Sequence, residues 1–298
     1  MNRRDETLGL WLGLLGVVIF AMTLPMTRLA VGPSSDPQLA PLFVTAGRAA
    51  LAGLLSVVVL LALRAGRPRA SQAVALAVCA AGTVVGFPLF LGLALREVDA
   101  MHAAVVTGLL PLGTALAAAL YFRQRPSLGF WACAVLGCGL VLAFAAHQGQ
   151  GRLGAADGLL LLAVLAGSIG YVAGACLANE MSAERVICWV LVFSLPLTLP
   201  VTLASWPGQP VRISAWLGLG YVSLFSMWLG FFAWYRGLAM GGAVRVSQVQ
   251  LVQPFLALLF AVPVLGETLE PATVAFSLAV IATVFLGKKM PVEKRSPA

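Results

Sequence analysis

Apolar residues along this chain gather into ten long segments separated by short polar loops. A helix of about 20 apolar residues crosses roughly 30 Å of hydrocarbon, and most of the segments reach this length. The pattern predicts an all-α membrane protein with ten transmembrane helices. The expected spans lie near residues 8–30, 41–63, 71–95, 102–121, 128–146, 158–178, 184–204, 213–238, 244–265 and 272–287.

Arginine and lysine residues fall in every second loop. Cytoplasmic loops of membrane proteins collect these residues, so the charges predict orientation as well as the number of spans. We therefore expect an integral protein of a bacterial-type plasma (inner) membrane with both termini in the cytoplasm. The expected cytoplasmic side holds Arg3, Arg4, Arg64, Arg67, Arg69, Arg123, Arg125, Arg185, Arg236, Arg245, Lys288, Lys289, Lys294 and Arg295, against Arg96, Arg152 and Arg212 opposite.

Composition excludes a soluble domain and explains the net charge. Of the 298 residues, 60% are hydrophobic and only 10% are charged. The formal charge of +8 is spread over the expected cytoplasmic loops, so topology explains it better than nucleic-acid binding. We expect a small-molecule substrate and membrane lipid as partners, and no nucleic acid.

Residues typical of metal sites or enzymes do not occur at useful spacings. The five cysteines lie inside apolar segments, where they suit packing. His102 and His147, both expected in outward loops, have no cysteine or carboxylate at ligand spacing. No span carries a nucleophile beside a base or a pair of carboxylates. We therefore expect no metal, no cofactor and no enzymatic activity.

The fourth and ninth spans are similar to each other without gaps. Leu95 through Ala118 align with Leu238 through Ala261, and Pro111 meets Pro254. The loop after the fourth span is basic, whereas the loop after the ninth carries two glutamates and no basic residue. Halves of five spans enter the membrane from opposite sides, which explains these opposite charges. The chain is thus expected to form two inverted five-helix repeats, residues 1–150 and 151–298, an arrangement typical of transporters.

Pairs of glycines four residues apart mark faces on which helices can approach closely. We expect packing contacts, and not ligand sites, at Gly9/Gly13, Gly82/Gly86 and Gly170/Gly174.

Several motifs give the chain a resemblance to the EamA-type drug/metabolite transporters. The run Phe20–Arg28 resembles the first-helix motif of that family, and Pro41–Arg48 resembles its second-helix pattern ending in arginine. Pro111 and Pro254 stand where the family has its helix-four and helix-nine prolines, and Leu265–Leu269 is similar to the Gly-Glu signature after helix nine. The resemblance covers nearly the whole chain and implies ten helices, two inverted repeats and small-molecule transport.

The chain departs from the family pattern in four places. Phe20 replaces a usual tryptophan, Arg123–Arg125 stands where the first repeat usually has a glutamate, and Cys133 and Phe276 replace a frequent glycine. These departures weaken a functional role for the glutamate motif. Among family members, the aromatic amino-acid exporters are nearest in length and layout.

Polar side chains inside the spans are candidates for substrate binding, because such groups usually face a cavity or another helix. Arg48 lies roughly 10 Å below the outer boundary at a rise of about 1.5 Å per residue. It either reaches back to the interface or offers a fixed positive charge to a carboxylate or phosphate. Arg28, near the outer end of the first span, has the same alternatives.

The other candidates offer hydrogen bonds or aromatic faces. Gln250 and Gln253 share a helix face, with Gln248 pointing elsewhere, and their amides either suit a zwitterion or join helices. Trp228, close to the centre of the eighth span, either fills a packing gap or stacks on an apolar substrate group. The remaining candidates for the substrate site are Thr23, Thr27, Phe87 and Tyr171.

Four prolines inside the spans are candidate hinges, because proline removes a helical hydrogen bond. These are Pro25, Pro88, Pro111 and Pro254.

The spans contain no central aspartate or glutamate, the group that coupled carriers commonly place in the membrane core. This favours facilitated transport or exchange. The leading hypothesis is an alternating-access transporter that exports small metabolites, with amino acids first among them, from the cytoplasm. The alternatives are a channel-like pore for small solutes and proton-coupled efflux of drug-like compounds.

Overall fold

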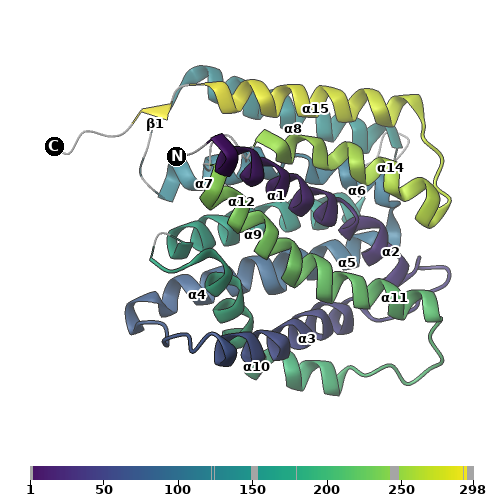
Figure 1. The fold of residues 1–298 in the computed structure, drawn as a ribbon. Helices are drawn as coiled ribbons and strands as arrows, with labels where there is room; N and C mark the ends of the chain where they lie inside the picture. Colours follow the sequence, from purple (N-terminus) through teal and green to yellow (C-terminus); the bar gives the residue numbers. More distant parts are fainter. Residues whose placement is uncertain are drawn as a thin grey trace.

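The computed structural model describes residues 3–121, 123, 125–148, 154–178, 180–241, 248–290 and 292–293. Within them the chain is almost entirely helical (Figure 1), which confirms the predicted all-α class. Seven helices are long and apolar enough to cross a bilayer: Thr7–Val31, Pro41–Ala62, Ala70–Glu97, Ala100–Tyr121, Ala155–Ala178, Glu184–Ala204 and Ile213–Gly237. Three shorter apolar helices are Leu128–Phe144, Gln253–Leu265 and Pro271–Gly287.

Many of these spans are built from more than one helical piece. In chain order the helices are α1 (Arg3–Ala21), α2 (Thr23–Val31), α3 (Pro41–Ala62), η1 (Ala70–Gln72), α4 (Ala73–Cys79), η2 (Ala80–Gly86), α5 (Phe87–Glu97), α6 (Ala100–Thr107), α7 (Leu110–Tyr121), α8 (Leu128–Gln148), α9 (Ala155–Ala178), α10 (Ala183–Ala204), α11 (Ile213–Tyr221), η3 (Val222–Leu229), α12 (Gly230–Gly241), η4 (Gln248–Val252), α14 (Gln253–Leu265) and α15 (Pro271–Lys289). The short strands β1 (Arg125–Pro126) and β2 (Val292–Glu293) pair antiparallel.

The breaks in four of the spans lie just before a proline. Each proline leaves the carbonyl four residues earlier without its helical partner, so the preceding turn is free to loosen. The first span divides at Met22 before Pro25, and the fourth divides between α6 and α7 before Pro111. Pro88 follows the π-helical segment η2, and Pro254 follows the 3₁₀ segment η4. The eighth span contains a second π-helical segment, η3, with no proline.

Most predicted span boundaries agree with the helices to within a few residues. Residues 244–247 of the predicted ninth span lie outside the described part of the chain, as does the side chain of Gln248. The expectation that His102 and His147 occupy loops is wrong. His102 lies inside α6 and His147 lies in the last turn of α8, because both helices extend beyond their apolar stretches.

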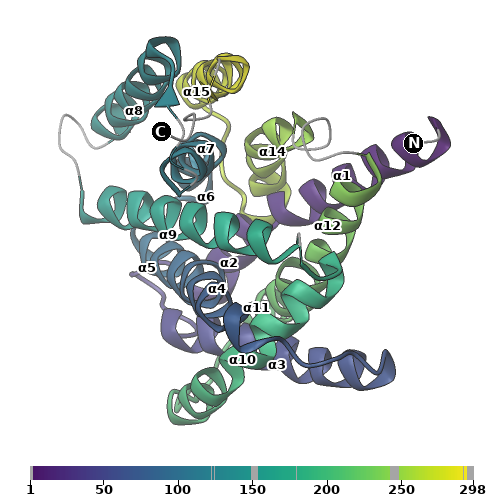
Figure 2. The same ribbon diagram turned by 90° about the vertical axis from the view of Figure 1, so that its left-hand side faces the viewer.

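Helices from the two halves of the chain lie side by side throughout the bundle (Figure 2). The neighbouring pairs are α1 with α12, α3 with α10, α5 with α9, α6 with α14, and α8 with α15. The α8–α15 pair stands at one edge of the bundle, against α6 and α7. Large apolar side chains such as Val58, Leu61 and Leu217 face outward, as a surface in contact with lipid requires.

Glycines allow the closest of these approaches. A Cβ added to Gly82 of η2 would lie 2.5 Å from the carbonyl oxygen of Ala166 and 2.7 Å from the Cα of Gly170, both on α9. A Cβ on Gly237 of α12 would lie 2.6 Å from the backbone nitrogen of Gly13 on α1. Two of the glycine pairs predicted to pack thus meet each other, and the third meets Gly237.

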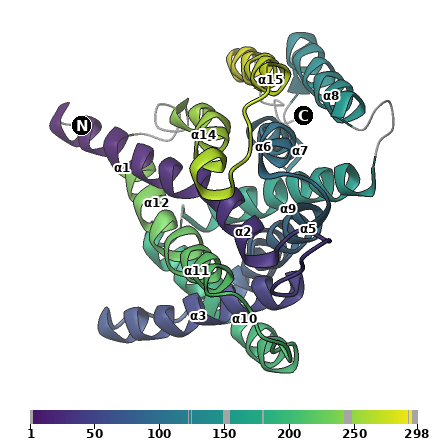
Figure 3. The same ribbon diagram turned by 90° about the vertical axis from the view of Figure 1, so that its right-hand side faces the viewer.

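The beginning of α1 and the end of α15 lie at the same end of the bundle (Figure 1). We call the opposite end, seen in Figure 3, the distal end. It is formed by the loops at residues 32–40, 98–99, 205–212 and 266–270.

Candidate functional site

A cavity lies inside the bundle, between helices of both halves. About 60 Å³ of it is open to the centres of water-sized molecules. Its polar lining consists of Thr23, Arg48, Thr83, Thr107, Tyr171, Ser226, Gln250 and Gln253. Aromatic and apolar side chains complete the walls, among them Phe20, Leu24, Phe87, Leu91, Met227 and Phe231.

Arg48 is the one charged residue among the described residues that line the cavity. It lies on α3 and is 3% exposed, so its side chain does not reach the interface. Its Nη2 donates a hydrogen bond to the hydroxyl of Ser226 at 3.1 Å, and this hydroxyl lies 2.8 Å from that of Thr23. Nε and Nη1 have no hydrogen-bond partner among the described residues. The guanidinium thus sits in the bundle as a positive charge bound only to a hydroxyl.

The two π-helical segments bring hydroxyl groups to the cavity. Ser226 comes from η3 and Thr83 from η2. The Thr83 hydroxyl donates a hydrogen bond to the carbonyl of Cys79, whereas the Ser226 hydroxyl makes hydrogen bonds across the bundle with Arg48 and Thr23. Because a π-helical turn holds an extra residue, it changes which side chains face inward after it.

Aromatic rings form one wall of the cavity. The ring centroids of Phe20 and Phe231 lie 5.1 Å apart, edge to face, and that of Tyr171 lies 6.5 Å from Phe231. Gln250 and Gln253, also in the lining, stand at the junction of η4 and α14. The site therefore combines one cation, several hydroxyl and amide groups, and an apolar aromatic surface.

Six of the eight residues predicted for substrate binding line this cavity: Thr23, Arg48, Phe87, Tyr171, Gln250 and Gln253. Thr27 is buried outside the lining. Trp228 also lies outside it and packs beside a core cluster, with its ring centroid 5.1 Å from that of Phe232. Of the four prolines, Pro25 lies outside the lining and the other three belong to it.

Sequence reasoning missed Ser226, Thr83 and Thr107, which line the cavity. A serine or threonine in a span usually bonds to the carbonyl one turn earlier, as Thr107 does to Ala103, so its position carries little signal. The one available signal for Ser226 was its place two residues before Trp228, near the middle of the eighth span.

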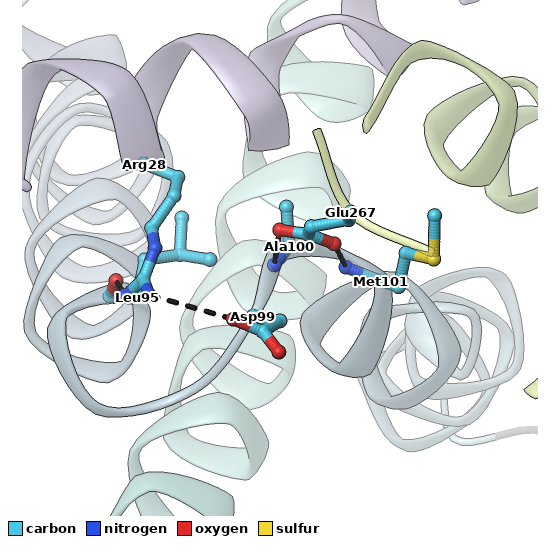
Figure 4. Close-up of polar contacts among 6 residues, drawn as sticks. All are labelled: Arg28, Leu95, Asp99, Ala100, Met101 and Glu267. Atoms are coloured by element: carbon cyan, nitrogen blue, oxygen red, sulfur yellow. Dashed lines mark hydrogen bonds and ion pairs between the residues drawn. The ribbon is translucent and has the colours of Figure 1, made fainter. Parts of the chain in front are cut away.

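At the distal end, the carboxylate of Glu267 holds the beginning of α6 (Figure 4). Its two oxygens accept hydrogen bonds from the backbone N–H groups of Ala100 at 2.7 Å and Met101 at 2.9 Å. A helix N-terminus leaves such N–H groups free and favours negative charge. Since Glu267 and α6 belong to opposite halves of the chain, this contact joins the halves. We call it the Glu267 clamp.

Burial and neighbouring charges set the ionisation of Glu267. Loss of hydration raises the pKa of this half-buried carboxyl above its ordinary value, and nearby Asp99 raises it further. The two backbone hydrogen bonds and Arg28 act in the opposite direction without cancelling the rise. Arg28 itself donates to the carbonyl of Leu95 and lies 3.4 Å from a carboxylate oxygen of Asp99. It therefore braces the turn before α6.

Further contacts join the halves at both ends of the bundle. At the distal end, Arg212 lies 2.6 Å from a carboxylate oxygen of Asp36. At the other end, the Gln72 amide donates to Glu180 at 2.7 Å. In addition, His102 of α6 and Asp157 of α9 are in contact at 2.7 Å.

A comparison with protein families matches the EamA-like transporter family twice, over residues 7–145 and 154–287. An uncharacterized transporter of Bacillus subtilis, YdeK, is 43% identical over 288 residues, covering 96% of this chain and 99% of its own. A probable terminal-alkyne amino-acid exporter of Streptantibioticus cattleyicolor is 25% identical over 296 residues, covering 97% of this chain and 96% of its own.

One solved crystal structure has the same fold, with a TM-score of 0.62. It covers 95% of this chain and 98% of its own at 19% identity. Because this identity is low, the likeness concerns the fold alone. The family matches span almost the whole chain, and a relative of 43% identity is named a transporter. The resemblance seen in the sequence is therefore confirmed, and the chain belongs to the EamA-like transporter family.

Proposed function

We propose that this membrane transporter exports small metabolites, with amino acids as the leading cargo, by an alternating-access mechanism. The observation that carries the proposal is the cavity between the halves, polar in its lining and surrounded by apolar helices. Support for the cargo comes from the relative named as a probable amino-acid exporter.

We infer further that the halves are two inverted five-helix repeats, residues 1–150 and 151–298. The two separate family matches support this division. The offset that aligns Leu95 with Leu238 also carries Ala80–Gly86 onto residues 223–229, so the two π-helical segments correspond. The pairing of helices is symmetric as well. If each helix is replaced by its counterpart in the other half, the α1–α12 pair becomes the α9–α5 pair. The α3–α10, α6–α14 and α8–α15 pairs map onto themselves.

Substrate in this proposal binds to the six predicted residues of the cavity lining, together with Ser226. Pro88, Pro111 and Pro254 serve as hinges, because each follows an irregular segment that can change its hydrogen bonds at low cost. Pro25 stands just after the break at Met22 and serves the first span in the same way. Rocking of the repeats about these points would expose the cavity to each side in turn.

Opening toward the distal end requires the contacts between the halves there to part. These include the Glu267 clamp, the Asp36–Arg212 ion pair, the hydrogen bond from the Arg212 N–H to the Gln38 side chain, and the His102–Asp157 contact. The loop charges make this end extracytoplasmic, which leaves both termini in the cytoplasm of a cell with a bacterial-type plasma membrane. The Gln72–Glu180 contact would then part when the cavity opens to the cytoplasm.

Facilitated transport or exchange fits the cavity better than ion coupling. No aspartate or glutamate is among the described residues of its lining, so no carboxylate is there to take up a proton or sodium ion with the cargo. Net export then follows from a high cytoplasmic concentration of cargo.

Counterflow in proteoliposomes tests this function. Liposomes loaded with one unlabelled amino acid should take up the same labelled amino acid faster than empty liposomes, with saturation and without a pH gradient. Flux that never saturates would indicate a channel. Flux that appears only with a pH gradient would indicate proton-coupled efflux. The proposal would be contradicted if no labelled amino acid entered the loaded liposomes faster than the empty ones, with the protein shown to be inserted and folded.

A further inference from the structure

Arg48 carries a charge that the protein itself leaves uncompensated. A buried ion costs several kcal/mol of effective hydration free energy unless an opposite charge or several hydrogen bonds replace the water. Here one hydroxyl replaces it, and two of the three guanidinium nitrogens have no partner among the described residues. The full sequence has no aspartate or glutamate between residues 37 and 96, or between 185 and 266. The helices that carry Arg48 and Ser226 therefore hold no acidic residue near their centres.

Arg28 differs from Arg48 in the partners that its charge meets. It lies near the end of its span, donates to a backbone carbonyl and faces Asp99, so its charge is met within the protein. Its side chain is 15% exposed. Arg48, by comparison, is deep in the bundle and has neither an acid nor a carbonyl as a hydrogen-bond partner in the described part of the chain.

From these observations we propose that Arg48 is the binding site for a carboxylate of the cargo, and that this group, not the amino group, is what the cavity requires. The inference rests on the proposed function, since it takes the cavity to be the place where cargo binds. A guanidinium presents parallel N–H donors that match the two oxygens of a carboxylate. A bound carboxylate would supply both the missing charge and the missing acceptors.

The rest of the lining explains why the amino group is dispensable. Around Arg48 the polar groups are neutral hydroxyls and amides, such as Thr23, Ser226, Gln250 and Gln253. These accept hydrogen bonds from an ammonium group but give it no charge partner. The cargo class is thus a carboxylic acid with a small or aromatic remainder. Amino acids belong to this class, and so do their N-acetyl and 2-hydroxy analogues.

Ligand-induced stabilisation of the purified full chain in detergent tests this inference directly. The probes are alanine, leucine and phenylalanine, each beside its N-acetyl derivative, its 2-hydroxy analogue and its amide, with sodium chloride at equal concentration as the control for a general anion. We expect acids of at least one series to raise the melting temperature, with or without the amino group. The amides, which keep the amine and lose the carboxylate, should shift it at least tenfold less at equal concentration.

The variants Arg48→Gln and Arg48→Lys refine the test. Arg48→Gln should abolish stabilisation by acids, and Arg48→Lys should retain it at lower affinity because the charge remains. Amides that bind as well as acids, chloride that binds as well as acids, acids that still bind to Arg48→Gln, or no binding of any acid would each overturn the inference. The ligand series needs no variant, so it decides even if Arg48→Gln fails to fold.

Counterflow with the same compounds separates this inference from the proposed function. Acids that bind without any saturable flux would contradict the carrier and leave the Arg48 site standing. Saturable flux of amides, undiminished in Arg48→Gln, would contradict the Arg48 site and leave the carrier standing.

Discussion

Arg48 and Ser226 meet at 3.1 Å, and their hydrogen bond joins the third helix of the structure to a π-helical segment in the other half of the chain. Ser226 also lies 2.8 Å from the Thr23 hydroxyl. The serine thus holds the guanidinium in one orientation while leaving its other donors free. The buried charge of Arg48 thus depends on the π-helical segment η3, which carries its one hydrogen-bond partner among the described residues.

Replacing Ser226 with alanine should weaken the binding of carboxylate cargo. A hydrogen bond to a charged group contributes about 1.5–3 kcal/mol, so we expect KM in counterflow to rise on the order of tenfold. Ser223→Ala is the matched control, because the Ser223 hydroxyl bonds to Leu219 within its own helix. An equal rise in both variants would show that the loss is general and unrelated to Arg48.

Gln250→Leu should change which cargo is preferred, since the amide lines the cavity and leucine offers no hydrogen bond. Loss of a neutral hydrogen bond of about 1 kcal/mol predicts a roughly fivefold change in relative KM across an amino-acid panel. Trp228→Phe, outside the cavity, should leave these ratios within about twofold and act on stability alone. The reverse pattern would contradict our placement of the site.

Gly82→Ala should destabilise the protein, because its methyl group would meet the backbone of α9. Overpacking of this kind costs about 1–3 kcal/mol and should lower the melting temperature in detergent. Gly139→Ala on α8 is the control, since nothing lies within 4 Å of a Cβ at that position. Alanine there should be neutral or slightly stabilising. Equal melting temperatures for the two variants would contradict close packing at Gly82.

Glu267→Ala should favour opening of the distal end, because the N–H groups of Ala100 and Met101 lose their acceptors. A single cysteine at Ala104, a residue of the cavity lining, can report this in a background without the native cysteines. We expect a thiol reagent added on the distal side to label it several-fold faster. Glu97→Ala removes an exposed carboxylate from the same end and should leave the labelling rate unchanged.

The raised pKa of Glu267 predicts a pH dependence of stability. Between the ordinary pKa of about 4.3 and the higher native pKa, the native protein holds a proton on Glu267 that the unfolded chain has released. The stability that this proton adds is therefore fully present below the ordinary pKa and is lost as pH rises through the native pKa. The melting temperature of the wild type relative to Glu267→Gln should therefore fall between pH 4 and the neutral range. Asp99 and Arg28 face the same carboxyl and are present in both proteins. A difference that grows with pH would contradict the prediction.

Sequence reasoning found five of the eight polar residues that line the cavity, because burial of polar groups in lipid is costly wherever they occur. Arg48, Gln250 and Gln253 stood out for that reason, and all three line the cavity. The prediction for Trp228 rested on depth alone. Its ring faces a core cluster, because Trp228 lies within the π-helical segment η3, where the wider turn changes which side chains face inward, and no residue type marks such a segment.

The sequence by itself determined the helical class, the family and the number of apolar segments, because these depend on composition, spacing and motifs along the chain. Only the tertiary structure decided that Ser226 is the contact of Arg48 and that Glu267 closes on α6. Each of these facts concerns residues more than 160 positions apart in the chain, whose distance in space depends on how helices of the two halves pack.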